Sequence, residues 1–168
     1  MKQIHFLSGL VLLVSITLSC SKNSDTSQDC SNFPVLSQSI TLNGTLSKLS
    51  VARFLLNSLA GYDRYAMSIS CLSSDCNKQT TFSLNIVIPS GTKLNGTYPI
   101  YDYVSADIQE FSGSYVTQAV NPISQSSLNL DSGTIKVVDK GSKLYNFDLS
   151  AALEGIGERV TLKGDVQF

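Results

Sequence analysis

Residues 80–88 read TTFSLNIVI, and this stretch decides the fold class. Its apolar residues Phe82, Leu84, Ile86 and Ile88 recur at every second position, with mostly polar residues between them. A period of two places all four side chains on one face of an extended chain, whereas a helix would distribute them around its axis. The stretch therefore predicts a β-strand with one buried face.

The same period recurs on both sides of this strand, in short runs that end in turn-forming residues. Residues 48–60 fit a strand and a short helix equally well, because their leucines also fall near helical spacing. Residues 121–127 are mostly polar and contain Pro122, which predicts a loop. The runs that predict further strands are residues 39–46, 64–71, 96–101, 109–118, 133–138, 143–151 and 158–168.

Together these runs predict an all-β domain over residues 33–168, which is long enough for one hydrophobic core. A sheet with one apolar face must bury that face against a second layer or against itself. We therefore expect an antiparallel β-sandwich or a small barrel, closed or open, of about eight strands.

The N-terminus carries the pattern of an export signal. Lys2 precedes an apolar run over residues 6–18, which is too short to span about 30 Å of hydrocarbon as a helix. The run ends in TLSC at residues 17–20, and this ending resembles the lipobox of Gram-negative bacterial lipoproteins, in which the cysteine is lipidated. An ordinary secretory signal with a chance cysteine is the alternative.

The lipobox resemblance implies three segments and a membrane address. Residues 1–19 would be the signal peptide, and Cys20 would carry the palmitate that anchors the chain. Residues 20–32 are rich in Ser, Asp and Asn, which predicts a flexible, disordered tether before the β-domain. Ser21 follows the cysteine where aspartate would imply retention at the inner membrane, so the resemblance implies the outer membrane. Whether the domain faces the periplasm or the outside stays open.

The last third of the chain resembles small exported lipoproteins of unknown function. The resemblance rests on SGTIKV at 132–137, YNFDL at 145–149 and LKGDV at 162–166, with GTY at 96–98 in the same style. It implies a β-domain on a lipid tether and no established chemistry.

The composition excludes several classes of function. His5, the only histidine, lies in the signal, and the chain has no tryptophan. Ser-His-Asp and Cys-His catalysis need an imidazole, as do most catalytic zinc sites. The 12 basic and 13 acidic residues form no basic stripe, so we expect no nucleic-acid partner. We predict that the chain is not an enzyme and uses no cofactor and no metal.

Three cysteines follow Cys20. Cys71 and Cys76 flank a short polar loop, and disulfides persist in exported proteins. We predict a Cys71–Cys76 disulfide, with Cys30 left over. The alternatives are a bond from Cys30 to either of the others, or a reduced Cys30.

The candidate ligand site is a group of residues beside the predicted turn at residues 95–96. Tyr98, Tyr101 and Tyr103 could stack on sugar rings while Asp102 accepts hydrogen bonds from their hydroxyls. The alternative is that these are ordinary strand-end and turn residues.

The carboxylates give weaker candidates. Asp102, Asp107 and Glu110 lack the regular spacing of a calcium loop. Glu154 and Glu158 flank a glycine-rich turn, where we interpret them as solubilising charges.

Our functional expectation is a noncatalytic, membrane-anchored lipoprotein that acts as an accessory binding or interaction module at the outer membrane and contacts a glycan or a protein. The alternative is a lipocalin-like carrier of a small hydrophobic ligand. The third is a glycan hydrolase that would use Asp102, Glu110 or Glu154.

Overall fold

The computed structural model describes residues 33–101 and 109–168 of the chain. Every regular element in these two ranges is a β-strand. The strands are β1 (Ser39–Leu42), β2 (Thr45–Leu59), β3 (Tyr62–Leu72), β4 (Lys78–Pro89), β5 (Gly96–Pro99), β6 (Glu110–Val120), β7 (Ile123–Asp139), β8 (Leu144–Leu153) and β9 (Arg159–Gln167). Within the described ranges, no helix has the length and apolar character to cross a membrane.

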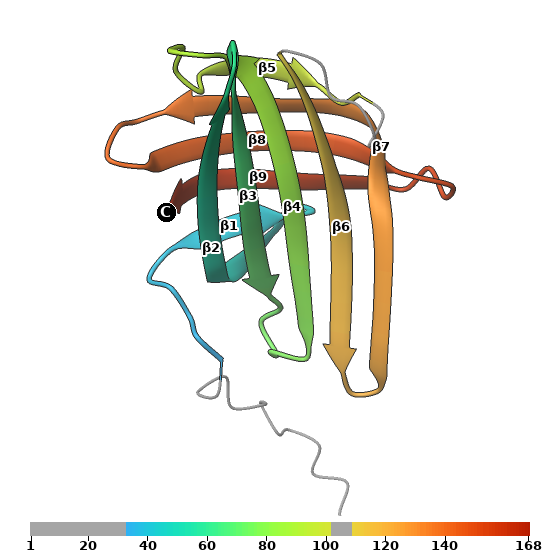
Figure 1. Ribbon diagram of the computed structural model, residues 1–168. Helices are drawn as coiled ribbons and strands as arrows, with labels where there is room; N and C mark the ends of the chain where they lie inside the picture. Colours follow the sequence, from blue (N-terminus) through green and yellow to red (C-terminus); the bar gives the residue numbers. More distant parts are fainter. Residues whose placement is uncertain (1–32, 102–108) are drawn as a thin grey trace, which may run out of the picture.

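Eight of the strands form a closed antiparallel barrel. Its order is β7-β6-β4-β3-β2-β1-β9-β8, and β8 pairs back with β7, while β5 adds to β7 as an extra strand. In Figure 1 the strands β2, β3, β4 and β6 form a front layer, and β5, β8 and β9 run across behind it. The all-β prediction and the number of strands are confirmed, and the barrel is closed.

Strand β7 belongs to both layers. It pairs with β6 along its first part and with β8 along its second part, and the register shifts between Leu130 and Ser132. Gly133 follows with a φ of 136°, and a Cβ there would collide with the carbonyl oxygen of Ser150. Bulges and glycines of this kind let a strand turn a corner. The bend at Gly133 therefore carries the chain from one layer to the other.

The loop predicted for residues 121–127 is wrong, because β7 begins at Ile123 and only Asn121-Pro122 forms the turn. The Asn77 side chain holds this turn by donating to the Asn121 carbonyl and accepting from its N–H, both at 2.8 Å. Residues 123–127 are exposed because this end of the hairpin extends past the core. Both faces of this segment carry polar residues, so its sequence lacks the apolar–polar alternation that identifies a half-buried strand.

Two further sequence interpretations change near the start of the domain. The single run predicted for residues 39–46 is a hairpin, because Asn43 and Gly44 adopt φ values of 48° and 77° and join β1 to β2. The ambiguous segment 48–60 is a strand, since β2 pairs with β3 as far as Leu59↔Tyr62. Its helix-like spacing arises because several of its leucines are exposed instead of lying on one buried face.

The barrel interior is one cluster of buried side chains. The predicted buried face of β4 lies in it, together with Tyr65, Met67, Ile69 and Cys71 of β3, so both predicted faces are confirmed. Phe82, Phe111 and Phe147 are fully buried within this cluster. Protein interiors are close-packed, and these three rings are part of that packed interior.

The predicted Cys71–Cys76 disulfide is wrong. Cys71 is a free thiol in the buried core, and Cys76 is disulfide-bonded. The alternation of β3 turns Cys71 into the barrel beside Ile69, whereas Cys76 lies in the loop before β4. Burial raises the pKa of the Cys71 thiol to about 12. The partner of Cys76 lies outside the described residues, as do Cys20 and Cys30.

A group of aromatic side chains joins the two layers beside β2. Phe54 of β2 stacks on Tyr145 of β8, with ring centroids 5.8 Å apart, and its ring also meets Phe168 at 5.5 Å and Tyr65 at 5.6 Å. Within β2, only residues Thr45–Lys48 pair with β1. Side chains, and not a backbone ladder, therefore connect the later part of β2 to the β8–β9 layer.

Candidate functional site

The tyrosines predicted to bind a ligand do not share one surface. Tyr98 on β5 is only 5% exposed, and burial raises the pKa of its hydroxyl. Tyr101 follows β5 and is 47% exposed. Asp102 and Tyr103 lie outside the described residues. The two described members thus differ in role, because Tyr98 is part of the core and Tyr101 is a surface residue.

The predicted carboxylates that the structure describes lie on different elements of the barrel. Glu154 accepts a hydrogen bond of 2.7 Å from the Asn129 amide, and it lies with Glu158 at the turn between β8 and β9. Glu110 begins β6, and Asp107 lies outside the described ranges. Among the described residues, no group of three or more His, Cys, Asp or Glu side chains could hold a metal ion.

A groove of about 550 Å³ lies across β2, β3 and β4. The strand registers place its outward-facing side chains in two rows, which are Arg53–Ser68–Ser83 and Leu55–Ala66–Asn85. On each strand, one residue stands between the two outward-facing ones and points to the core instead, because successive side chains of a strand alternate. These inward-facing residues are Phe54, Met67 and Leu84. The groove therefore lies on the outside of the barrel, in the front layer of Figure 1.

The chemistry of this outer groove is that of recognition. Its floor is made by small side chains, and Arg53 and Leu55 rise at its β2 side. Hydroxyl and amide groups of Ser68, Ser83 and Asn85 can donate and accept hydrogen bonds, and the guanidinium of Arg53 offers up to five donors. None of these groups is a usual general acid or base near neutral pH. Arg53 makes no ion pair with any residue of the described ranges.

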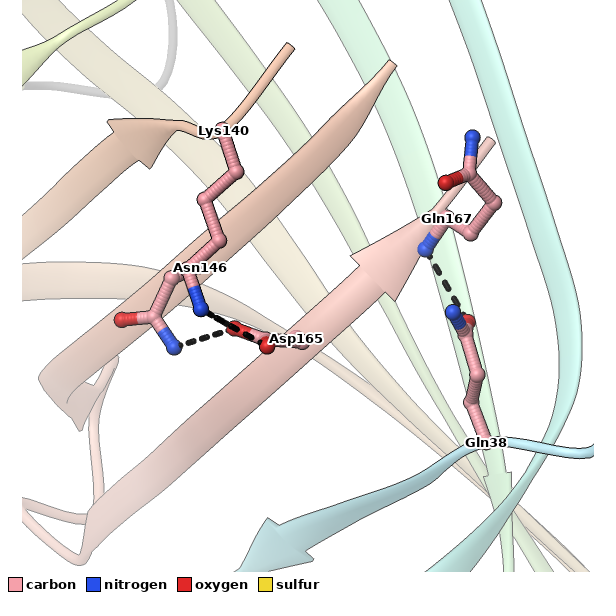
Figure 2. A network of polar contacts seen from close by, with 5 residues as sticks. All are labelled: Gln38, Lys140, Asn146, Asp165 and Gln167. Atoms are coloured by element: carbon pink, nitrogen blue, oxygen red, sulfur yellow. Dashed lines mark hydrogen bonds and ion pairs between the residues drawn. The ribbon is translucent and has the colours of Figure 1, made fainter. Parts of the chain in front are cut away.

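The outer face of the β8–β9 layer is different, because it holds two lysine–aspartate ion pairs. Figure 2 shows Lys140 donating to both carboxylate oxygens of Asp165 at 2.8 Å, with Asn146 donating to the same group at 2.7 Å. These hydrogen bonds, led by that of Lys140, lower the pKa of Asp165. In the same view the Gln167 N–H donates to the Gln38 side chain at 3.0 Å, which fastens the segment before β1 to β9.

A second ion pair completes the contrast between the faces. Lys163 meets Asp148 at 2.8 Å on the β8–β9 face. The cations Lys140 and Lys163 of that face are thus paired, whereas Arg53 at the outer groove is available to a partner.

Sequence reasoning did not find the outer groove. Arg53, Ser68 and Ser83 are separated by 15 residues at each step and meet only through the strand registers. On its own strand each is an ordinary polar residue between apolar ones. The residues beside Tyr98 are neighbours in the sequence, whereas the residues of the groove come from three separate strands.

Comparison with known proteins adds no family. None of the protein-family models, curated proteins or solved structures with which the chain was compared matches it.

Proposed function

We propose that the chain is a noncatalytic lipoprotein, anchored through Cys20 at the outer membrane, that binds a partner on the outside of its barrel. The lipobox-like ending at Cys20 supports the anchor, and Ser21 directly after it supports the address. The outer groove across β2, β3 and β4 supports the binding role. A lipid anchor leaves the folded domain free to present a recognition surface, since membrane attachment needs no part of that domain.

The observation that carries the proposal is an outer groove with an available cation. Arg53, Ser68, Ser83 and Asn85 offer polar contacts at a site of about 550 Å³, a size typical of ligand sites. Arg53 lacks an ion-pair partner in the described chain. Its guanidinium can therefore bind a carboxylate of the ligand through two parallel hydrogen bonds.

The groove favours a protein partner over a glycan. Sugar rings are usually held by stacking on aromatic side chains, and the outward-facing groove residues include none. An extended peptide segment needs hydrogen-bonding groups, an apolar contact and an acid for Arg53. The groove offers all three, with Leu55 as the apolar contact.

The two other functional expectations have less support. A lipocalin-like carrier would need space among the inward side chains, where Phe82, Phe111 and Phe147 are buried together. A glycan hydrolase would need two carboxylates at a fixed separation in a cleft. Glu154 instead bonds Asn129 at an exposed turn.

Site-specific photo-crosslinking tests the proposal in the cells that make the protein. Benzoylphenylalanine replaces Ser83 in the groove in one strain, and Ser150, a half-buried serine on the outer face of β8, in the control strain. We expect a discrete, protease-sensitive adduct at position 83 and none at position 150. A protease-resistant adduct would indicate a glycan partner, and equal labelling at both positions or none at either would contradict a binding role for this groove.

A further inference from the structure

The later half of β2 has a free backbone edge. Strand β3 pairs with residues 51–59 along one side, as far as Leu59↔Tyr62. On the other side β1 reaches only Lys48, and the segment before β1 makes its last backbone bonds with Leu49. Within residues 33–101 and 109–168, no strand pairs with the second side of residues 51–59. Every second residue of this segment therefore presents its N–H and C=O to the free edge.

This edge lacks the features that usually protect edge strands, which are proline, inward-pointing charge, bulges and short length. Residues 51–59 contain no proline, and their one charged residue, Arg53, faces outward. The bulge of β2 lies just before the segment, between Leu49 and Val51. By contrast the outer strand β5 has only four residues and ends in Pro99.

The free edge is also apolar on both faces. Leu55 is 57% exposed, Leu56 is 45% exposed and Leu59 is 47% exposed. Large exposed apolar residues that cluster on one element mark a surface for another molecule. Backbone groups and leucines together fit a partner that adds a strand to the sheet.

We propose that this edge pairs, antiparallel, with the same edge of a second copy of the chain around a two-fold axis at Leu55. A two-fold axis brings a strand edge against the same edge of the second copy in antiparallel orientation. The free N–H and C=O groups of each copy then form hydrogen bonds with those of the other. The register would oppose Val51 to Leu59, Ala52 to Ser58, Arg53 to Asn57, Phe54 to Leu56, and Leu55 to its own copy.

Charge is compatible with this self-pairing. Arg53 is the only charged residue between positions 51 and 59, and it would face the neutral amide of Asn57. The two copies of Arg53 would lie four residues apart along the ladder, which is about 13 Å at about 3.3 Å per residue. That separation exceeds the screening length of about 8 Å in physiological salt, so like charges do not oppose the dimer.

The dimer would extend the front layer from one barrel into the next and place two outer grooves on one continuous face. It requires no ligand, so it holds or fails independently of the proposed function. The β2–β3 turn also lies at the far end of the barrel from the start of the coloured chain, which is drawn in blue in Figure 1. The free edge therefore stands away from the end at which the chain enters the domain.

Sedimentation of the full chain in detergent, over a range of concentrations, tests the dimer. Leu55→Lys would place two lysines face to face at the axis, while in a single copy the exposed site tolerates a charge. Leu46→Lys is the matched control, because Leu46 is an exposed leucine of the same strand outside the free edge. We expect a dimer in the wild type and in Leu46→Lys, and a dissociation constant raised about 100-fold or more in Leu55→Lys.

A charge-swap experiment separates disrupted pairing from disrupted folding. Mixing Leu55→Lys with Leu55→Glu should restore a dimer that contains one copy of each variant. A wild type that stays monomeric, or a dimer that Leu55→Lys leaves intact, would overturn the inference. Binding of the monomer to phosphatidylglycerol-containing vesicles, lost in Leu55→Glu, would assign the leucines to a lipid surface instead.

Discussion

At the scale of single residues, Gly133 is the position on which the barrel depends most visibly. Its φ of 136° lies where side chains are disfavoured, and a Cβ would also collide with the backbone of Ser150 and Ala151. Both effects fall at the corner of β7, where the chain changes layers.

Replacing Gly133 with alanine should therefore destabilise the fold by about 3 kcal/mol, from backbone strain and overpacking together. Gly91→Ala is the control, because Gly91 has a φ of 78° but open space around its Cβ position. It should cost only about 1 kcal/mol. Urea unfolding of both variants measures the difference, and equal losses would show that the collision is not important.

Cys71 and Cys76 differ in chemistry although five positions separate them. Burial holds the pKa of the Cys71 thiol at about 12, so the reactive thiolate is nearly absent at pH 8. Cys76 is disulfide-bonded. If Cys20 carries lipid, Cys30 is the one cysteine left to be its partner.

Peptide mapping without reduction should thus find Cys76 joined to Cys30. Iodoacetamide at pH 8 should label Cys71 only after unfolding in urea. A peptide that joins Cys71 to Cys76, or rapid labelling of Cys71 in the folded protein, would contradict this assignment.

At the scale of strands, a strand and its buried face could be predicted wherever its own residues alternate between apolar and polar. Residues 80–88 and 64–71 alternate apolar and polar side chains, and both strands formed with the expected face buried. Residues 123–127 could not be identified in this way, because they lie where the β6–β7 hairpin passes beyond the core. The turn at Asn43-Gly44 could not be recognised either, because a two-residue turn does not interrupt the alternation of apolar and polar residues.

The ion network on β8 and β9 gives a prediction at this scale. Asp165 has a lowered pKa, led by its hydrogen bond with Lys140, and Asp165→Ala should cost about 0.5 kcal/mol at pH 7, because the pair is partly exposed. Asp148→Ala is the control and should cost less, since Asp148 lacks a partner equivalent to Asn146 among the described residues.

The pH dependence of this effect has a definite sign. A carboxylate whose folded pKa lies below the unfolded value of about 3.9 stabilises the fold above that value. The contribution is lost as the pH falls through the folded pKa. Urea unfolding at pH 7, 5 and 3 should show a constant gap between wild type and Asp165→Ala at the two higher values, and a smaller gap at pH 3. A gap that widens at pH 3 would contradict the assignment.

At the scale of the whole molecule, the two proposed binding surfaces arise from the way the strands pair. The row Arg53–Ser68–Ser83 exists only because β2, β3 and β4 pair in one register, and the free edge exists only because β1 is four residues long. No local pattern encodes either feature, so the sequence could suggest a binding module but not its surface. Cys76 was misassigned for a related reason, because nearness in sequence does not determine which way a side chain points.

We propose a lipid-anchored barrel that recognises a protein partner on its outer groove. Native mass spectrometry of the chain extracted from membranes in mild detergent tests this claim most directly, with Ser83→Arg filling the groove and Ser150→Arg as the control on the other face. We predict residues 20–168 with acyl mass on Cys20, and a bound protein that is present in the wild type and Ser150→Arg but lost in Ser83→Arg. A chain without acyl mass, or a small apolar ligand retained by all three proteins, would contradict the account.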